Sequence, residues 1–213
     1  MPIDINGNVE DITIDGQNVQ EVTIDGQLAW KRETIIDDFE RASLSHYRIS
    51  TGAFDIIPNR SSHGSRSLRA LGGDGNKVIL SRPGDGLNAY PSRGDTIRFD
   101  IQFNSTNGLL LFGFFHGPGA AEEDGYELEF DARNNQLTLY DDRGSENRFQ
   151  LGSDSTGYAA DTWNQCTINT HGGGIDVSYR GANISVNDTS RNNGGVLFFT
   201  DGVRGFWDYL RYE

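Results

Sequence analysis

The chain has 213 residues, of which 31 are acidic and 18 basic, so its formal charge is −13 and its pI lies near 4.6. A charge of this sign argues against polyanionic partners such as DNA or anionic lipid. The single Cys166 excludes an intramolecular disulfide and a thiolate zinc site, and no stretch approaches the roughly 20 apolar residues that span a bilayer. We therefore expect a folded, turn-rich protein that binds no nucleic acid, inserts into no membrane and, since its start is polar, carries no secretion signal.

The choice of charged residue types is as unusual as the net charge. Lys31 and Lys77 are the only lysines, and aspartate outnumbers glutamate about two to one. Short, strongly hydrated carboxylates with almost no lysine resemble the surfaces of proteins from extreme halophiles. The alternative is an ordinary acidic extracellular protein, because net charge alone keeps many proteins soluble.

A short unit repeats in the first thirty residues at a spacing of about ten: Ile3-Asp-Ile-Asn-Gly, Ile12-Thr-Ile-Asp-Gly-Gln and Val22-Thr-Ile-Asp-Gly-Gln. Alternation followed by Asn-Gly or Asp-Gly predicts hairpins, because these pairs accept the positive φ of a type I′ turn. A ribbon this small is marginal alone and must dock on the rest of the chain, on another copy or on another subunit. We predict an anchoring segment over residues 1–32, with an apolar assembly face formed by Ile12, Ile14, Val22, Ile24 and Trp30.

From Thr34 onward, strand-like segments follow one another every ten to fifteen residues, and no amphipathic helix intervenes. Many short strands separated by Gly, Asn and Asp turns predict an all-β sandwich or barrel. We assign residues 33–213 to this single domain.

Several stretches of the domain resemble known families. The run "NSTNGLLLFGFF", a polar insertion and "GYELEFDARNNQLTLYDDRGS" is similar to the laminin-G pattern, as is the later "DTWNQCTINTHGGGIDVSYRGANISV". The terminal segments "IIDDFE" and "GFWDYLRYE" resemble the paired end strands of concanavalin-like carbohydrate-binding modules. The resemblance implies an antiparallel jelly-roll β-sandwich. In front of it, "VTIDGQLAW" resembles N-terminal pieces of structural proteins in tailed viruses.

The segment "GLLLFGFF" is apolar on both faces of its predicted strand. Leu109, Leu111 and Phe115 share one face, while Leu110, Phe112 and Phe114 share the other. One face fills the core, and a second apolar face needs a cover. The N-terminal ribbon or another subunit would supply it, so we expect an oligomeric or assembled protein.

Three carboxylates project from one side of the segment "GYELEFD". Glu127, Glu129 and Asp131 alternate with apolar residues, and concanavalin-like glycosidases that resemble family 16 use a nucleophile and an acid/base on such a strand. The family order is nearer E-x-D-x-x-E, whose last acid would fall on Ala132. The other interpretation is a solvated acidic face, and we expect no catalysis.

Metal and cofactor sites have weaker signals. Asp37, Asp38 and Asp208 would meet where the terminal strands pair, and a calcium ion needs six to eight converging oxygens. They could equally be ordinary strand and turn residues. The four histidines have no metal-ligand spacing, and we expect no cofactor other than this structural calcium.

Sugar recognition would use aromatic rings and polar side chains on loops at the edge of the sandwich. The longest irregular insertion, from His116 to Tyr126, brings glycines and acids together. We expect Trp163 and Trp207 to pack in the core. The predicted carbohydrate-binding residues are His116, Glu123, Asp124, Tyr126, Tyr90 and Tyr158.

A fold used mostly outside cells and a start without a signal are compatible in a virion protein, which assembles in the host cytoplasm and is released by lysis. We therefore predict a tail, baseplate or capsid-surface protein of a virus of a halophilic archaeon. Its partners would be other virion proteins, copies of itself and host surface glycans. The alternatives are a concanavalin-like glycoside hydrolase or lyase, and a cellular carbohydrate-binding adhesion module.

Overall fold

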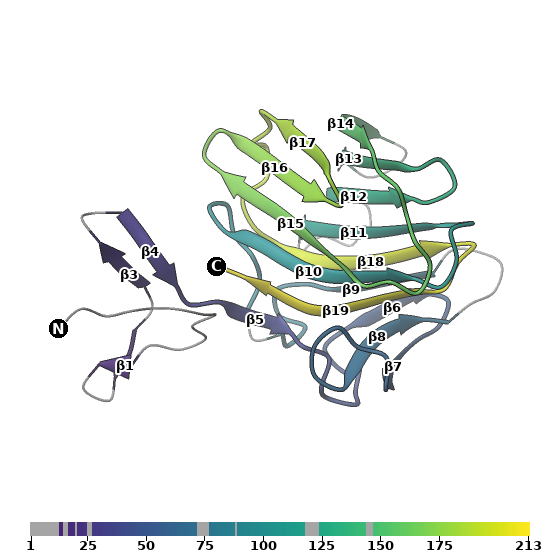
Figure 1. Ribbon diagram of the computed structural model, residues 1–213, viewed down its shortest axis with the longest axis horizontal. Helices are drawn as coiled ribbons and strands as arrows, with labels where there is room; N and C mark the ends of the chain where they lie inside the picture. Colours follow the sequence, from purple (N-terminus) through teal and green to yellow (C-terminus); the bar gives the residue numbers. More distant parts are fainter. Residues whose placement is uncertain are drawn as a thin grey trace.

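The computed structural model describes residues 13–14, 17–19, 21–24, 27–71, 77–87, 89–117, 124–143 and 147–213. Its regular elements are all strands, which stack in two antiparallel layers (Figure 1). The predicted all-β antiparallel sandwich is therefore confirmed. The described residues contain no helix long and apolar enough to cross a membrane.

The layer that we call sheet I contains the last strand of the chain. Its order is β17-β16-β15-β10-β19-β8-β7, and β5 also pairs with β19. The bounds are β5 (Thr34–Asp37), β7 (Phe54–Pro58), β8 (Arg66–Ala70), β10 (Thr96–Phe103), β15 (Asn164–His171), β16 (Gly174–Tyr179), β17 (Ala182–Val186) and β19 (Gly205–Tyr212).

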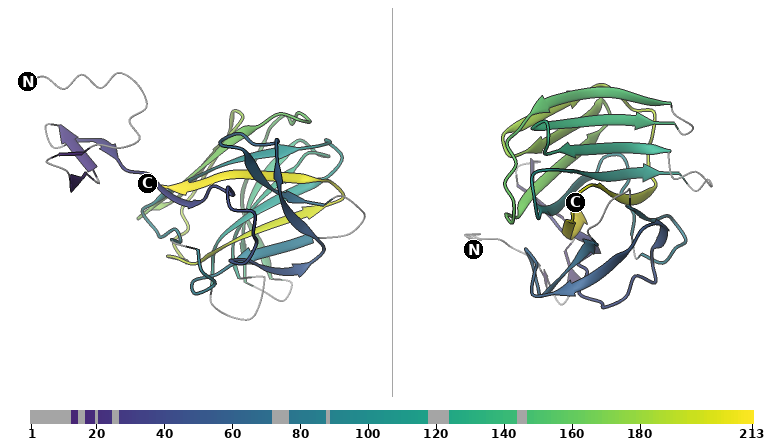
Figure 2. Two further views of the ribbon diagram at one scale, coloured as in Figure 1. Left: turned by 90° about the horizontal axis from the view of Figure 1, so that it is seen from below. Right: turned by 90° about the vertical axis from the view of Figure 1, so that its right-hand side faces the viewer.

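The facing layer, sheet II, has the order β14-β13-β12-β11-β18-β9-β6. The bounds are β6 (Arg48–Thr51), β9 (Lys77–Ser81), β11 (Leu109–His116), β12 (Gly125–Asp131), β13 (Gln136–Asp142), β14 (Arg148–Ser155) and β18 (Gly195–Asp201). Strands β11 to β14 are neighbours in both sequence and sheet, whereas β11 also pairs with β18, which is distant in sequence. Figure 2 shows the two layers edge-on.

The core lies between the sheets and is rich in aromatic rings. Period-two alternation turns Ile97, Phe99 and Ile101 of β10 inward, and the ring of Phe99 lies 4.2 Å from that of Phe112 in β11. Trp207 is fully buried, as expected, and so is Cys166. Trp163 is only half-buried and meets Phe206 edge-on, so the expectation of a core position for Trp163 holds in part.

The N-terminal strands form two separate ribbons: β1 (Thr13–Ile14) with β2 (Gln17–Asn18), and β3 (Glu21–Ile24) with β4 (Gln27–Lys31). The β3–β4 hairpin stands beside β5 and the C-terminus, clear of both sandwich faces (Figures 1 and 2). The β3–β4 hairpin does not cover the outer face of β11. Of the two covers expected for that face, another subunit stays a prediction. Glu33 fixes the base of the hairpin, 3.0 Å from Arg211 and 3.7 Å from Arg98.

Of the predicted assembly face, Val22 is half-buried. Ile14, Ile24 and Trp30 belong to the strands, but their side chains lie outside the described part of the chain, as does all of Ile12 and the unit at Ile3. The division between residues 1–32 and 33–213 stays a prediction.

Candidate functional site

A groove of about 330 Å³ runs over the outer face of sheet II. It is built from side chains that alternation turns away from the core on six neighbouring strands, from β9 to β14 in the order of the sheet. The lining residues are Val78, Leu109, Leu111, Glu127, Glu129, Asp142, Arg148, Leu197, Phe199 and Asp201.

The floor of the groove is apolar. The strand register places Val78, Phe199 and Leu111 in one row across β9, β18 and β11, and Leu197 and Leu109 lie on either side of this row. These side chains form a small cluster that is separate from the core. Phe199 remains half-exposed. Leu109 and Leu111, on the outer face of β11, therefore form part of the floor of a groove. From the sequence, this face was expected to contact the N-terminal ribbon or another subunit.

The wall of the groove beside this apolar floor is charged. Arg148, on the edge strand β14, stacks on the Tyr140 ring at 3.7 Å and reaches across β13. Its guanidinium lies 2.9 Å from Glu127 and 2.8 Å from Glu129. Asp142 is its direct cross-strand neighbour. One arginine thus bridges the two carboxylates that the sequence made candidates for catalysis.

Asp131, the third acid of β12, has a different role. Its carboxylate accepts hydrogen bonds from the Arg133 amide at 3.0 Å and from the Asn134 side chain at 2.7 Å, so it closes the β12–β13 turn. Burial raises the pKa of Asp131, but these hydrogen bonds lower it by more, and the net shift is downward. The predicted row of three acids divides into an ion-paired couple and a turn residue.

His116 belongs to the structure rather than to a sugar surface. A bulge at Phe115, with φ 57°, turns the next side chain outward, and His116 packs over Gly113 and Gly125, where a Cβ atom would overlap the imidazole. Only 1% of His116 is exposed. It cannot stack on a ligand from solution, which corrects the prediction for this residue.

Tyr126 is also buried. Its hydroxyl contacts Asp188, Ser190 at 3.2 Å and Arg93 at 3.3 Å. These bonds hold residues 187–194 against the end of β12, and they satisfy the hydroxyl away from solvent. Asp124 pairs with Arg191 at 2.5 Å, and Glu123 lies outside the described residues. In the part of this loop that the structure describes, Tyr126 and Asp124 therefore hold the segment of residues 187–194 to the end of β12.

The two remaining predicted tyrosines are half-buried against the core. The Tyr90 hydroxyl lies 2.9 Å from that of Ser81, and the Tyr158 hydroxyl donates to the Gln136 carbonyl at 2.8 Å. Burial raises the pKa of Tyr158 well above its usual range. Neither ring lines the groove, and Phe199 is the aromatic residue among those that do.

The three predicted calcium ligands have separate partners. Asp37 is buried and accepts from the Tyr47 hydroxyl at 2.7 Å, Asp38 accepts from the Glu40 amide at 3.1 Å, and Asp208 accepts from Ser62 and His63. In the part of the chain that the structure describes, no three His, Cys, Asp or Glu side chains are grouped to hold a metal ion. The structure does not bring the three aspartates together.

Known proteins resemble this chain in structure but not in sequence. No family model and no curated protein matches it. A carbohydrate-binding module, CBM66 of Bacillus subtilis, superimposes with a TM-score of 0.59 at 14% identity over 78% of this chain and 94% of its own. A family 16 glycoside hydrolase of Bacteroides ovatus, in complex with its G4G4G3G product, gives 0.58 at 13% over 83% and 98%.

A protein of unknown function with a galectin-like fold, also from Bacillus subtilis, gives 0.57 at 12% identity over 78% of this chain and 88% of its own. The likeness is one of fold. The neighbours place the chain among jelly-roll sandwiches that include carbohydrate-binding modules and glycoside hydrolases.

Proposed function

We propose that this protein is a carbohydrate-binding domain that does not hydrolyse its ligand, and that the groove on the outer face of sheet II is its binding surface. The observation that carries the proposal is the combination of an apolar floor with a hydrogen-bonding wall in one groove. Specific ligand pockets commonly join an apolar surface to a few placed polar groups. The neighbours' fold supports the same function class.

Each part of the groove has a function in sugar binding. The Leu111 and Phe199 side chains would contact the C–H faces of a sugar ring, and this burial supplies the hydrophobic part of the affinity. The Glu129 and Glu127 carboxylates accept hydrogen bonds from hydroxyl groups, and Arg148 donates them. The groove would bind a few sugar units of a longer glycan.

Replacing Phe199 by alanine should weaken glycan binding about tenfold or more, because roughly 1.5–3 kcal/mol of apolar contact is lost when a large side chain no longer packs on the ligand. The measurement is isothermal titration with the best ligand from a glycan array. Phe149→Ala is the matched control, since Phe149 is 49% exposed on β14 and does not line the groove. Equal losses in the two variants would place the binding surface elsewhere.

We expect the wild-type protein to release no reducing sugar from mixed-linkage β-glucan or related polysaccharides. A retaining glycosidase needs one carboxyl that donates a proton and a second that attacks. Here one guanidinium contacts both candidate carboxylates, an arrangement of two paired anions. Activity that disappears in Glu129→Gln would overturn the non-catalytic assignment.

The setting of the domain is a further part of the proposal. The hairpin β3–β4 projects from the sandwich, and Glu33 pairs with two arginines at its base, which suits an anchoring arm that joins a sugar-binding domain to an assembly. The virion of a halophilic archaeal virus, with other virion proteins, copies of this chain and host glycans as partners, stays a prediction from the sequence. Electron microscopy of the source particle with a labelled antibody would decide it, and an absent label would contradict it.

A further inference from the structure

We infer that the groove selects glycans that carry a positive charge, namely amino sugars with an unsubstituted ammonium group, over neutral sugars and uronates. This inference rests on the proposed function and names the ligand class of the same groove. Its basis is the charge that surrounds the apolar floor.

Four carboxylates and one guanidinium line the groove, so its formal charge is −3. The carboxylates are Glu127, Glu129, Asp142 and Asp201, and the guanidinium is that of Arg148. Just outside the groove, Arg133 pairs with Asp201 at 3.3 Å and with Asp131 at 3.4 Å. Including Arg133 and Asp131 adds one positive and one negative charge, so the formal charge of the groove stays at −3. The whole chain carries −13, and its field has the same sign.

This charge excludes one class of sugar and favours another. A uronate or sulfated sugar would bring a further anion to a wall that already has excess negative charge, and like charges at contact distance repel strongly in a partly buried site. A glucosamine unit instead brings three N–H donors on one ammonium to oxygens that only accept. Its ring keeps the C–H face that the leucine floor requires.

Arg148 occupies the position that the ligand ammonium would take. Its side chain is 31% exposed and reaches the carboxylates from the edge strand, whereas Glu127 and Glu129 are only 9% and 14% exposed. The carboxylates are therefore fixed within the sheet, while the guanidinium can move toward solvent. An incoming ammonium would replace the guanidinium between the two acids.

The test is isothermal titration of the full chain with three tetrasaccharides: β-1,4-linked glucosamine, its N-acetylated form and galacturonate. At mildly acidic pH and low salt we expect the glucosamine tetramer to bind at least tenfold more tightly than the N-acetylated one, and the galacturonate tetramer not to bind. The preference should fall as salt rises and as the amine loses its proton at alkaline pH.

Removing the competing guanidinium of Arg148 is the most discriminating test, because the proposal expects the affinity to rise. Arg148→Met should raise the affinity for the glucosamine tetramer severalfold, and Glu129→Gln should lower it by a similar factor. Arg48→Met is the matched control, because it removes one positive charge from β6, where Arg48 pairs with Asp85 away from the groove. An increase that is equal in Arg148→Met and Arg48→Met would reflect overall charge and contradict the displacement.

The outcomes separate the two proposals. Equal affinity for the glucosamine and N-acetylated tetramers, with binding lost in Phe199→Ala, would overturn the charge selection and leave the carbohydrate-binding function standing. Binding of a lysine tetrapeptide as tight as that of the glucosamine tetramer would overturn the assignment to a sugar. No binding by any glycan in the array would overturn both.

Discussion

Replacing Asp208 by alanine is expected to lower the free energy of unfolding by about 3 kcal/mol, which corresponds to a fall in Tm of roughly 6–12 °C for a chain of this size. Asp208 is fully buried in β19. Its carboxylate accepts from the amides of Ser62 at 2.8 Å, His63 at 2.9 Å and Tyr209 at 2.8 Å. Alanine would leave these donors without a partner inside the protein. Thermal and urea unfolding would measure the loss.

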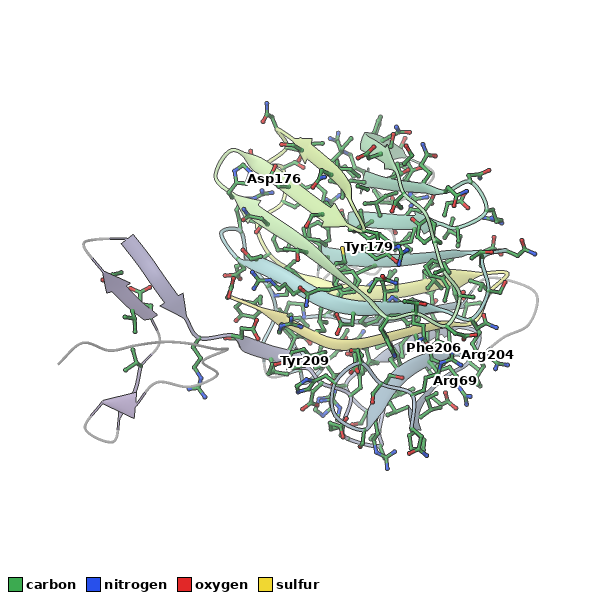
Figure 3. All side chains as sticks on the ribbon, viewed as in Figure 1. Arg69, Asp176, Tyr179, Arg204, Phe206 and Tyr209 are labelled. Atoms are coloured by element: carbon green, nitrogen blue, oxygen red, sulfur yellow. The ribbon has the colours of Figure 1, made fainter. Side chains whose placement is uncertain are left out.

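The same aspartate holds an irregular part of the sheet together. The register between β10 and β19 shifts beside it, and Tyr209 takes a left-handed φ of 48°. Tyr209 lies next to the end of β5 (Figure 3), with the His63 ring stacked on it at 3.9 Å. Removing the carboxylate therefore also releases residues 61–64 from the sheet. Alanine in place of Ser62 should matter less, because the backbone amide that bonds Asp208 is kept.

The pH dependence of the stability of Asp208→Asn, compared with wild type, shows whether burial or the amide hydrogen bonds dominate the pKa of Asp208. Burial raises the pKa of Asp208 above its ordinary 3.8, while the amide donors act in the opposite direction without cancelling the shift. A raised pKa in the folded state means that the stabilisation is complete below the ordinary value and is lost as pH rises through the raised one. The stability advantage of wild type over Asp208→Asn should therefore shrink from about pH 3 to pH 6. An advantage that grows with pH would contradict this sign.

The sequence predicts the sandwich because its signal is local and repeated. In β10 the alternation of Ile97, Phe99 and Ile101 with polar residues predicts one buried face, and these three side chains are fully buried. The double apolar pattern of β11 also predicts a second surface that binds something. What covers that surface does not follow from the pattern, because leucine side chains suit a protein partner and a sugar ring equally.

The groove wall and the anchors were not predictable in the same way. Arg148 reaches Glu127 and Glu129 only because β14 pairs with β13 in a register that contains a bulge, and a register shift of one residue would turn Arg148 to the other face. His116 and Tyr126 were chosen as loop residues, but the bulge at Phe115 folds the histidine onto glycines. Non-glycine residues with positive φ are rare, so sequence alone gives no signal for them.

Replacing Arg191 by alanine is expected to destabilise the protein by about 3 kcal/mol, in the range seen when one partner of a buried ion pair is removed. Arg191 lies in the segment before β18 and is 14% exposed. Its guanidinium donates to Asp141 at 2.8 Å, to Asp124 at 2.5 Å and to the Asp142 carbonyl at 2.5 Å. Because Asp141 is only 1% exposed, its charge would lose half of its arginine contacts without gaining water.

Arg143→Ala is the matched control, since Arg143 binds the same carboxylate of Asp141 at 2.6 Å but is 57% exposed. Exposed ion pairs contribute about 0–1 kcal/mol, so this variant should lose at most that much. Arg191→Met keeps most of the side-chain volume and separates charge from packing; a loss close to that of alanine would assign the effect to the ion pairs. Urea unfolding with an unchanged m-value measures all three variants. Similar losses in Arg191→Ala and Arg143→Ala would mean that water reaches Asp141 as soon as either arginine leaves, and the buried anchor would then be no stronger than a surface pair.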